Sequence, residues 1–135
     1  MTQLKEKSKF NFDAADLLIK GSLYAPSVHC SYYGCFQLMK FIIKDFFGKT
    51  YNQLNSDIAV SRKNTHKYII DYIAKEIRDN ASLVEFRNFS NTINDLKRFR
   101  EQSDYEDIEI DFDLSAKALN KAKEIQQQLK NNFHI

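Results

Sequence analysis

The sequence has few residues that interrupt helices and no long apolar run. It contains one proline, three glycines and no tryptophan in 135 residues. A β-sandwich or barrel needs turn residues at regular intervals, so this scarcity argues against an all-β fold. No run of about 20 apolar residues occurs, which argues against a membrane-spanning helix. The composition therefore favours long helices joined by short loops within one domain, residues 1–135.

Cysteine and histidine are also scarce, which limits the chemistry that the chain can offer. Cys30 and Cys35 lie five positions apart in a predicted helix and point about 140° apart, so we expect reduced, buried thiols. The three histidines, His29, His66 and His134, are scattered, and the sequence contains no Gly-rich phosphate loop. We expect no metal site and no cofactor. The first ten residues lack the apolar core of a signal peptide, so we expect a cytoplasmic protein.

What the sequence does contain is a strongly apolar helical segment at residues 26–47. Apolar side chains recur there at steps of three and four, which places them on one face of an α-helix. Tyr33 and Leu38 belong to a second set that widens this face, so neighbouring helices must cover most sides. We predict the central helix of a bundle, with Pro26 in its first turn and Gly48 at its end. The residues of the first set are Val28, Tyr32, Cys35, Phe36, Met39, Ile43 and Phe46.

Further amphipathic segments predict the rest of the bundle. Residues 1–10 are expected to be a flexible lead-in, after which Asn11 or Asp13 caps the first helix. Residues 49–63 are undecided between one helical turn and a basic loop. The fold class is therefore all-α, an antiparallel bundle of four long helices with a fifth. The predicted helices are residues 11–25, 26–47, 64–78, 82–102 and a last helix capped by Asp113.

Charge is unevenly distributed along the chain. Seven acidic residues and no lysine or arginine occur between Glu101 and Asp113. This segment carries −7 against a net charge of +2 for the whole chain, which leaves +9 on the rest. Such a basic body can attract a polyanion, but a solvated surface with an acidic loop folded onto it has the same composition. Residues 105–112 alternate between acidic and apolar side chains, which predicts an extended segment with its apolar side inward.

A short motif stands at the end of the fourth predicted helix. Arg98 is followed after four residues by Ser103 and, two positions later, by Tyr105. Near the start of the central helix, a tyrosine pair at 32–33 is followed three residues later by Phe36. Together these motifs resemble the HEPN superfamily of small helical-bundle proteins. The resemblance covers the order and approximate length of the predicted helices, and thus most of the chain.

The resemblance implies two possible functions, of which one is catalytic. In nuclease members of that superfamily an arginine and a histidine of this motif cleave RNA, usually across a homodimer. Arginine holds a phosphate, and histidine can move a proton near neutral pH. Arg98 and Tyr105 match the motif, but Ser103 stands at the histidine position and His29 is the candidate substitute. This alternative is a metal-independent ribonuclease with a degenerate Arg-x4-Ser-x-Tyr motif.

The missing histidine favours the other function, a non-catalytic binding module. The resemblance implies a homodimer that binds RNA, a nucleotide or a partner protein. It also suggests a toxin–antitoxin-like partner, a minimal nucleotidyltransferase that could modify Tyr105. A structural role is the further alternative, in which Arg98 pairs with Asp104 where the helix ends. The expected binding residues are Arg98, Arg100, Asp104, Tyr105 and Tyr32.

Overall fold

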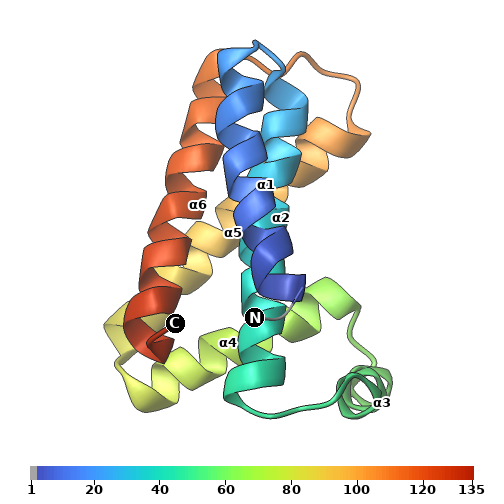
Figure 1. The fold of residues 1–135 in the computed structure, drawn as a ribbon, viewed down its shortest axis with the longest axis vertical. Coiled ribbons are helices and arrows are strands. Elements are labelled where there is room, and N and C mark those ends of the chain that lie inside the picture. Colours follow the sequence, from blue (N-terminus) through green and yellow to red (C-terminus); the bar gives the residue numbers. More distant parts are fainter. Residues whose placement is uncertain (1–2) are drawn as a thin grey trace.

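The computed structural model describes residues 3–135 and contains only helices and loops over that range (Figure 1). The prediction of an all-α fold is confirmed, since no strand occurs among these residues. The elements are α1 (Gln3–Lys20), α2 (Tyr24–Phe41), a π-helical turn η1 (Ile42–Phe46), α3 (Tyr51–Ser61), α4 (Thr65–Asn80), α5 (Leu83–Tyr105) and α6 (Phe112–Phe133).

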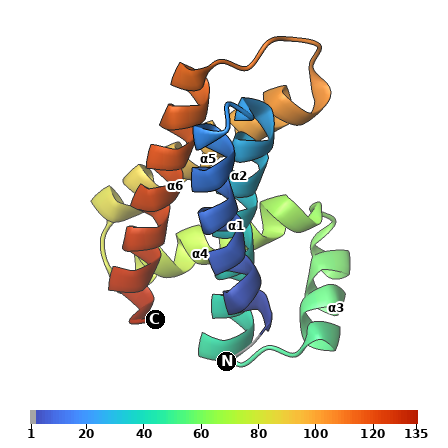
Figure 2. The same cartoon turned by 45° about the horizontal axis from the view of Figure 1, so that its top comes forward.

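The helices form a bundle around α2. α1 runs antiparallel to α2, α6 lies beside both, and α5 crosses behind them (Figure 1). α4 crosses the lower end of the bundle, while α3 stands to one side (Figures 1 and 2). Both ends of the described chain lie at the lower end, opposite the loop that joins α5 to α6.

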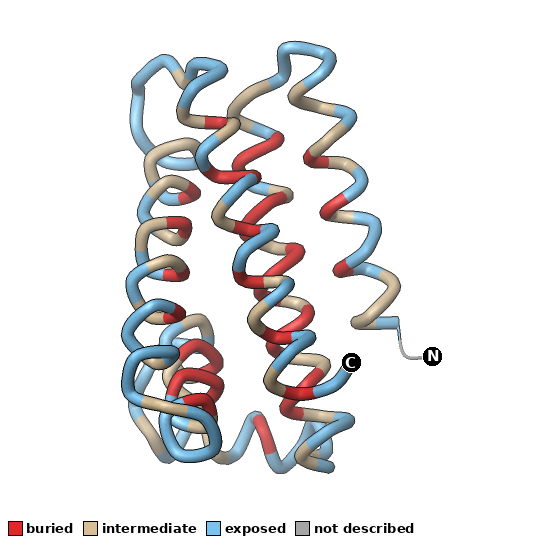
Figure 3. Tube along the Cα trace, turned by 90° about the vertical axis from the view of Figure 1, so that its left-hand side faces the viewer, coloured by how far each residue is buried: buried red, intermediate tan, exposed pale blue. Residues whose placement is uncertain are grey.

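α2 is buried on most sides, as its apolar pattern predicts. It packs against α1, α4, α5 and α6. Figure 3 shows the buried residues gathered where the helices face one another. Val28, Tyr32, Cys35 and Met39 are fully buried along its length. The hydrophobic core of the protein is therefore organised around this helix.

The end of this long helix departs from the predicted pattern. Residues 42–46 form a π-helical turn, closed by the hydrogen bond from the Phe47 nitrogen to the Ile42 carbonyl at 3.1 Å. A π turn places one more residue between donor and acceptor than an α turn, so the side chains that follow change direction. Phe46 is consequently exposed rather than buried, and Phe47 packs on the core instead. Gly48 then adopts a positive φ of 71°, as predicted for the end of the helix.

The first helix begins and ends earlier than predicted. It is helical from Gln3, so the predicted lead-in of residues 1–10 is wrong from that residue on, and residues 1–2 lie outside the described range. Contact with α2 explains this, because the Ser8 hydroxyl donates to the Gly34 carbonyl at 2.7 Å and Phe12 is buried. The helix ends at Lys20 rather than at Ala25, since Ser22 has a left-handed φ of 62°.

α2 begins at Tyr24, two residues before the predicted start, and Pro26 lies in its first turn as predicted. At that position the missing backbone N–H of proline costs no intrahelical hydrogen bond.

The undecided region, residues 49–63, contains a full helix rather than one turn. Thr50 and Gln53 form a reciprocal capping box at the start of α3, with side-chain to backbone distances of 3.1 and 2.9 Å. Leu54 is the buried residue that anchors α3 to the core. The two helices that follow begin as predicted, with Asn64 capping α4 and Ser82 capping α5.

The acidic segment between α5 and α6 forms an irregular loop with bends at residues 106–108, rather than the predicted extended segment. Residues 106–111 lack regular structure, and the alternation predicts burial correctly only for Ile110, which packs against the core. Ile108 and Phe112 are exposed. Asp111, rather than Asp113, caps α6 by accepting a hydrogen bond from the Leu114 nitrogen at 2.9 Å. The helix begins two residues earlier than predicted because the Asp111 carboxylate satisfies the free amide of Leu114 in the first turn.

Among the residues described, no helix combines the length and the apolar character needed to cross a bilayer.

Candidate binding site

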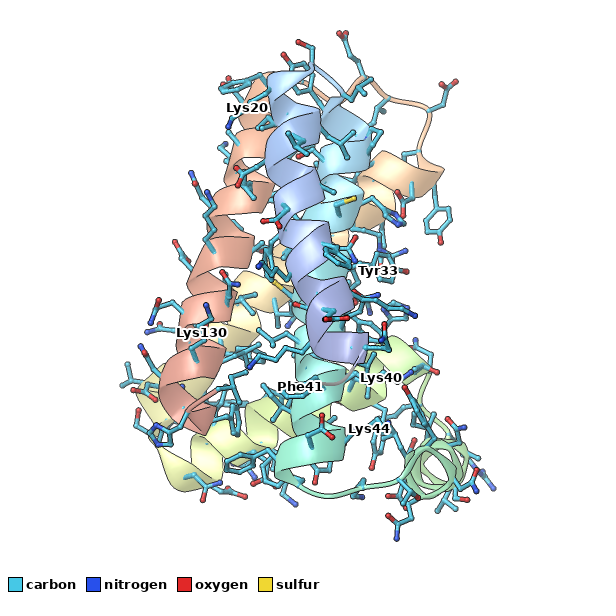
Figure 4. All side chains as sticks on the ribbon, viewed as in Figure 1. Lys20, Tyr33, Lys40, Phe41, Lys44 and Lys130 are labelled. Carbon is cyan, nitrogen blue, oxygen red and sulfur yellow. The ribbon has the colours of Figure 1, made fainter. Side chains whose placement is uncertain are left out.

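The first half of α2 and the end of α5 bring together most of the residues that the motifs single out. α2 and α5 pack against each other, and the first turn of α4 meets them. Figure 4 labels Tyr33, one member of this group, beside α2. We call the group the α2–α5 cluster. Its members are His29, Tyr32, Tyr33, His66, Arg100, Asp104 and Tyr105.

Arg100 is the centre of the α2–α5 cluster. It is only 5% exposed, and its guanidinium lies 5.0 Å from the ring centroid of Tyr32 and 5.6 Å from those of Tyr33 and Tyr105. Such cation–π contacts are strongest where water is excluded. Its Nη1 donates to the Tyr105 hydroxyl at 3.3 Å and lies 3.6 Å from Asp104 Oδ2. Its Nε is buried and has no hydrogen-bond partner among residues 3–135.

The surroundings of Arg100 keep it charged. Burial opposes the charged form, but the oxygens of Tyr33, Tyr105 and Tyr32 outweigh this effect and raise the pKa of Arg100. A buried cation whose N–H group has no partner can bind an anionic group by donating a hydrogen bond to it. Tyr105, which is 76% exposed, covers this cation from the solvent side.

His29 and Asp104 form a second polar pair beside Arg100. Nδ1 of His29 lies 2.9 Å from Oδ2 of Asp104. The side chain of His29 is 47% exposed and that of Asp104 is 19% exposed. A carboxylate that accepts from Nδ1 leaves Nε2 of the ring as the acceptor nitrogen. Sequence alone could not place His29 near the motif, and the structure does so.

His66 joins the α2–α5 cluster from the first turn of α4. Its Nδ1 lies 2.7 Å from the Tyr32 hydroxyl, and its ring stacks on Phe36 with centroids 4.4 Å apart. Burial lowers the pKa of His66, and the positive charges of Arg100 and Lys97 lower it further. The neutral imidazole can therefore accept a hydrogen bond from the Tyr32 hydroxyl, which keeps its proton because burial raises its pKa.

Two residues of the predicted site lie differently from expectation. Arg98 is exposed and pairs with Asp95 at 3.2 Å, so the predicted pairing of Arg98 with Asp104 is wrong. Residues two positions apart lie about 200° apart around a helix, so Arg98 and Arg100 cannot share a face. The Ser103 hydroxyl is buried without a partner among the described residues. It is therefore poorly placed to carry a proton to a ligand.

Tyr32 is fully buried and lies under Arg100 and His66. Its role in the α2–α5 cluster is to support these two side chains.

Sequence reasoning missed the central position of Arg100 and the membership of His66. A signal for Arg100 existed, because it continues a buried stripe with spacings of four, three and four. That stripe consists of Phe89, Ile93, Leu96 and Arg100. No pattern in the sequence predicts that His66 belongs to the cluster, because its position depends on how α4 packs against α2.

Among residues 3–135, no group of three or more His, Cys, Asp or Glu side chains is placed to hold a metal ion. Comparison with known proteins gives no matching family model and no match among curated proteins. Membership of the HEPN superfamily therefore stays a prediction that rests on the motifs.

Proposed function

We propose that this chain is a HEPN-like binding module that acts as a homodimer and binds single-stranded RNA or a nucleotide at the α2–α5 cluster. The antiparallel arrangement of the four long helices predicted from the sequence, and a cytoplasmic location, are parts of this proposal. The observation that carries it is the buried guanidinium of Arg100, whose Nε is unpartnered and whose cover is the exposed ring of Tyr105.

The chemistry of the cluster suits a nucleotide. Movement of the Tyr105 ring would open the Arg100 guanidinium to a phosphate, which arginine binds in a planar fork. The displaced ring would offer a flat surface for a base, and base–aromatic stacking contributes about 1–3 kcal/mol per base. Nε2 of His29 adds a hydrogen-bond acceptor on the exposed side. The positive charge outside the acidic segment favours approach of a polyanion.

Binding of a labelled single-stranded RNA, measured by fluorescence anisotropy, tests the proposal. Affinity should fall steeply as salt rises, because phosphate contacts release counterions. His29→Ala and Tyr105→Ala should weaken binding while leaving the melting temperature nearly unchanged, since both side chains are exposed. Arg98→Ala is the matched control, because Arg98 lies on α5 like Tyr105 but outside the α2–α5 cluster. Binding that ignores salt, or that depends on Arg98 alone, would contradict the proposed site.

A second candidate function, metal-independent RNA cleavage, is favoured by the His29–Asp104 pair. A carboxylate that orients an imidazole is the arrangement that a general base requires, and Arg100 lies next to the same carboxylate. His29 would then take the role that Ser103 cannot take. RNA cleavage by the purified protein in EDTA, lost in His29→Ala and kept in Arg98→Ala, would support this function. RNA binding without cleavage would support the non-catalytic binding module instead.

The suggested nucleotidyltransferase partner can be tested at Tyr105. The phenol stands at the end of α5 and is largely exposed, so an enzyme could reach it. Transfer of a nucleotidyl group from a nucleoside triphosphate to the phenolic oxygen, with release of pyrophosphate and the phenolic proton, would block its contact with Arg100. Intact-mass measurement after co-expression with such an enzyme, beside a Tyr105→Phe control, would detect the added nucleotide.

A further inference from the structure

A cleft of about 490 Å³ lies between α1 and α6. Figure 1 shows these two helices on the side that faces the viewer. The two helices touch each other little, because each packs mainly on α2. Phe12, Leu38 and Ile135 give the cleft an apolar floor. The Ser8 hydroxyl, which also lines it, already donates to the Gly34 carbonyl. The floor therefore offers apolar contact and no free polar group at Ser8.

The rim of the cleft is charged, and its charge differs between the two ends. At the upper end Lys123 pairs with Asp16 at 3.7 Å, and Asp13, which also lines the cleft and forms no ion pair within residues 3–135, makes that end slightly negative. At the lower end stand Lys5, Lys9 and Lys130. Lys9 and Lys130 are exposed and form no ion pair with any residue in the range 3–135. An apolar floor with a cationic rim fits an occupant that alternates acidic and apolar side chains.

The same chain carries such a segment. The acidic loop, residues 106–111, joins α5 to α6 and alternates carboxylates with isoleucines. Glu106, Asp107 and Glu109 form no ion pair within the described range. Ile108 lies between them and is 51% exposed. Successive side chains of an extended segment point to opposite sides. Ile108 can therefore face the apolar floor of the cleft while the carboxylates on either side of it face the charged rim.

The dimensions of the cleft and the acidic loop agree. The α1 side of the cleft runs from Lys5 to Asp16, which at 1.5 Å per residue is about 17 Å. Ile110 packs on the core of its own molecule and Asp111 caps α6, so residues 106–109 are the part of the loop that can dock, and four extended residues span about 13 Å. The acidic loop can therefore lie along most of the cleft, with its carboxylates near the lysines of both helices.

The acidic loop of the same molecule does not occupy this cleft. It lies at the upper end of the bundle, whereas Lys5, Lys9 and Lys130 belong to the ends of α1 and α6 near the chain termini (Figures 1 and 2). We propose that the cleft of each copy receives the acidic loop of a second copy, in a two-fold symmetric dimer. An antiparallel arrangement of two copies sets each acidic loop beside the partner's lower end, and the symmetry makes the contact twice.

This inference gives the proposed homodimer its interface, but it does not rest on ligand binding at the α2–α5 cluster. The cleft uses α1 and α6, whereas the cluster uses α2, α4 and α5. RNA binding and dimer formation are therefore measured separately on the same samples, so that one can fail while the other stands.

Complementary charge reversal tests the dimer. The cleft variant is Lys9→Glu/Lys130→Glu, and the loop variant is Asp107→Lys/Glu109→Lys. Light scattering of the wild type should give about twice 15.9 kDa. Each variant alone places like charges in both contacts, so its dissociation constant should rise on the order of a hundredfold. An equimolar mixture of the two variants should dimerise again, because both contacts of the mixed dimer join opposite charges.

The control variant Lys7→Glu/Lys117→Glu changes the same net charge on the same two helices outside the cleft, and it should remain dimeric. Circular dichroism melting checks that all variants fold.

Four results would overturn the proposal. They are a monomeric wild type, an assembly larger than a dimer, variants that fail to restore each other when mixed, and a dimer that resists both reversals. The last result would place the interface on another surface, such as the exposed Phe10 and Leu17 of α1.

Discussion

The Tyr32 hydroxyl and Nδ1 of His66 lie 2.7 Å apart, although 34 positions separate the two residues in the chain. This contact joins the centre of α2 to the start of α4 in a partly buried setting. A neutral imidazole can accept a hydrogen bond from the hydroxyl at this distance, and the lowered pKa of His66 favours that neutral form. Protonation of His66 would remove this acceptor and add a positive charge near Arg100 and Lys97.

The stability of the protein should therefore depend on pH through His66. The pKa of His66 is lower in the folded state than its ordinary value of 6.5, so the unfolded chain binds this proton first. Above pH 6.5 the residue makes no pH-dependent contribution. As pH falls through 6.5 towards the lower folded pKa, stability is lost. Tyr32, Tyr33, Arg100, Lys97 and Glu101 are the charged or titratable groups that face the ring.

Urea unfolding between about pH 8 and pH 5 measures this loss, since histidine titrates in that range. The variant His66→Gln should be less stable than the wild type at high pH, because its side chain cannot reproduce the stack on Phe36. The difference between the two proteins should shrink as pH falls. A difference that stays constant across the range would show that His66 does not titrate in the folded state as argued.

Arg100 and Arg98 should differ sharply in their effect on folding. Arg100→Gln removes a buried cation from three tyrosine rings and from Asp104, and should cost about 2–3 kcal/mol. Arg98→Gln removes an exposed cation that pairs with Asp95 within the same helix, and should change stability by less than about 0.5 kcal/mol. Chemical denaturation of both variants measures the two free energies of unfolding. Equal changes in the free energy of unfolding would show that Arg100 is not the central residue of the α2–α5 cluster.

Gly34 should not tolerate a side chain. A Cβ atom at this position would lie 3.1 Å from the ring of Phe12, which is closer than ordinary packing allows. Gly34→Ala should push the buried Phe12 ring aside by a few tenths of an ångström, and after the gain of about 1 kcal/mol in helix propensity it should leave a net loss of up to about 2 kcal/mol. Gly21→Ala is the control, because a Cβ there would meet its nearest atom at 3.6 Å. A lower melting temperature for Gly34→Ala alone is expected, and similar values for both variants would argue against close packing at Gly34.

α3 should open independently of the bundle. It stands to one side, and Leu54 is its one buried side chain within the described structure (Figure 2). Thr50→Ala breaks the capping box and should weaken α3 by about 1 kcal/mol. Hydrogen exchange should then become faster at the amides of α3 while exchange in α2 stays slow. Equal acceleration in both helices would show that α3 unfolds only together with the core.

The sequence predicts the helices well wherever a cap or an apolar period marks them. Asn64 and Ser82 start their helices as expected, and the central position of α2 follows from apolar residues on most of its sides. The errors occur where contacts distant in sequence decide the local structure. α1 extends to Gln3 because Ser8 and Phe12 meet α2, and no local pattern carries that information.

The candidate site was predictable in its elements but not in its geometry. The motifs indicate the start of α2 and the end of α5, and these two segments do meet. Which arginine faces inward depends on the phase of α5, which places Arg100 against the tyrosines and Arg98 toward solvent. The His29–Asp104 contact spans 75 positions and follows only from the way that the two helices pack.

The central position of α2 has a consequence for how the protein acquires its fold during synthesis. α1 precedes α2 directly and can pack on it as soon as both have left the ribosome. The opposite side of α2 must wait for α6, as the contact of Cys35 with the Ala122 carbonyl, 87 positions later, illustrates. Until then the nascent chain exposes the apolar side chains of Met39 and Ile43, which are buried in the native state. Unfinished chains of this kind are prone to aggregation, so chaperone demand should peak before the last helix emerges.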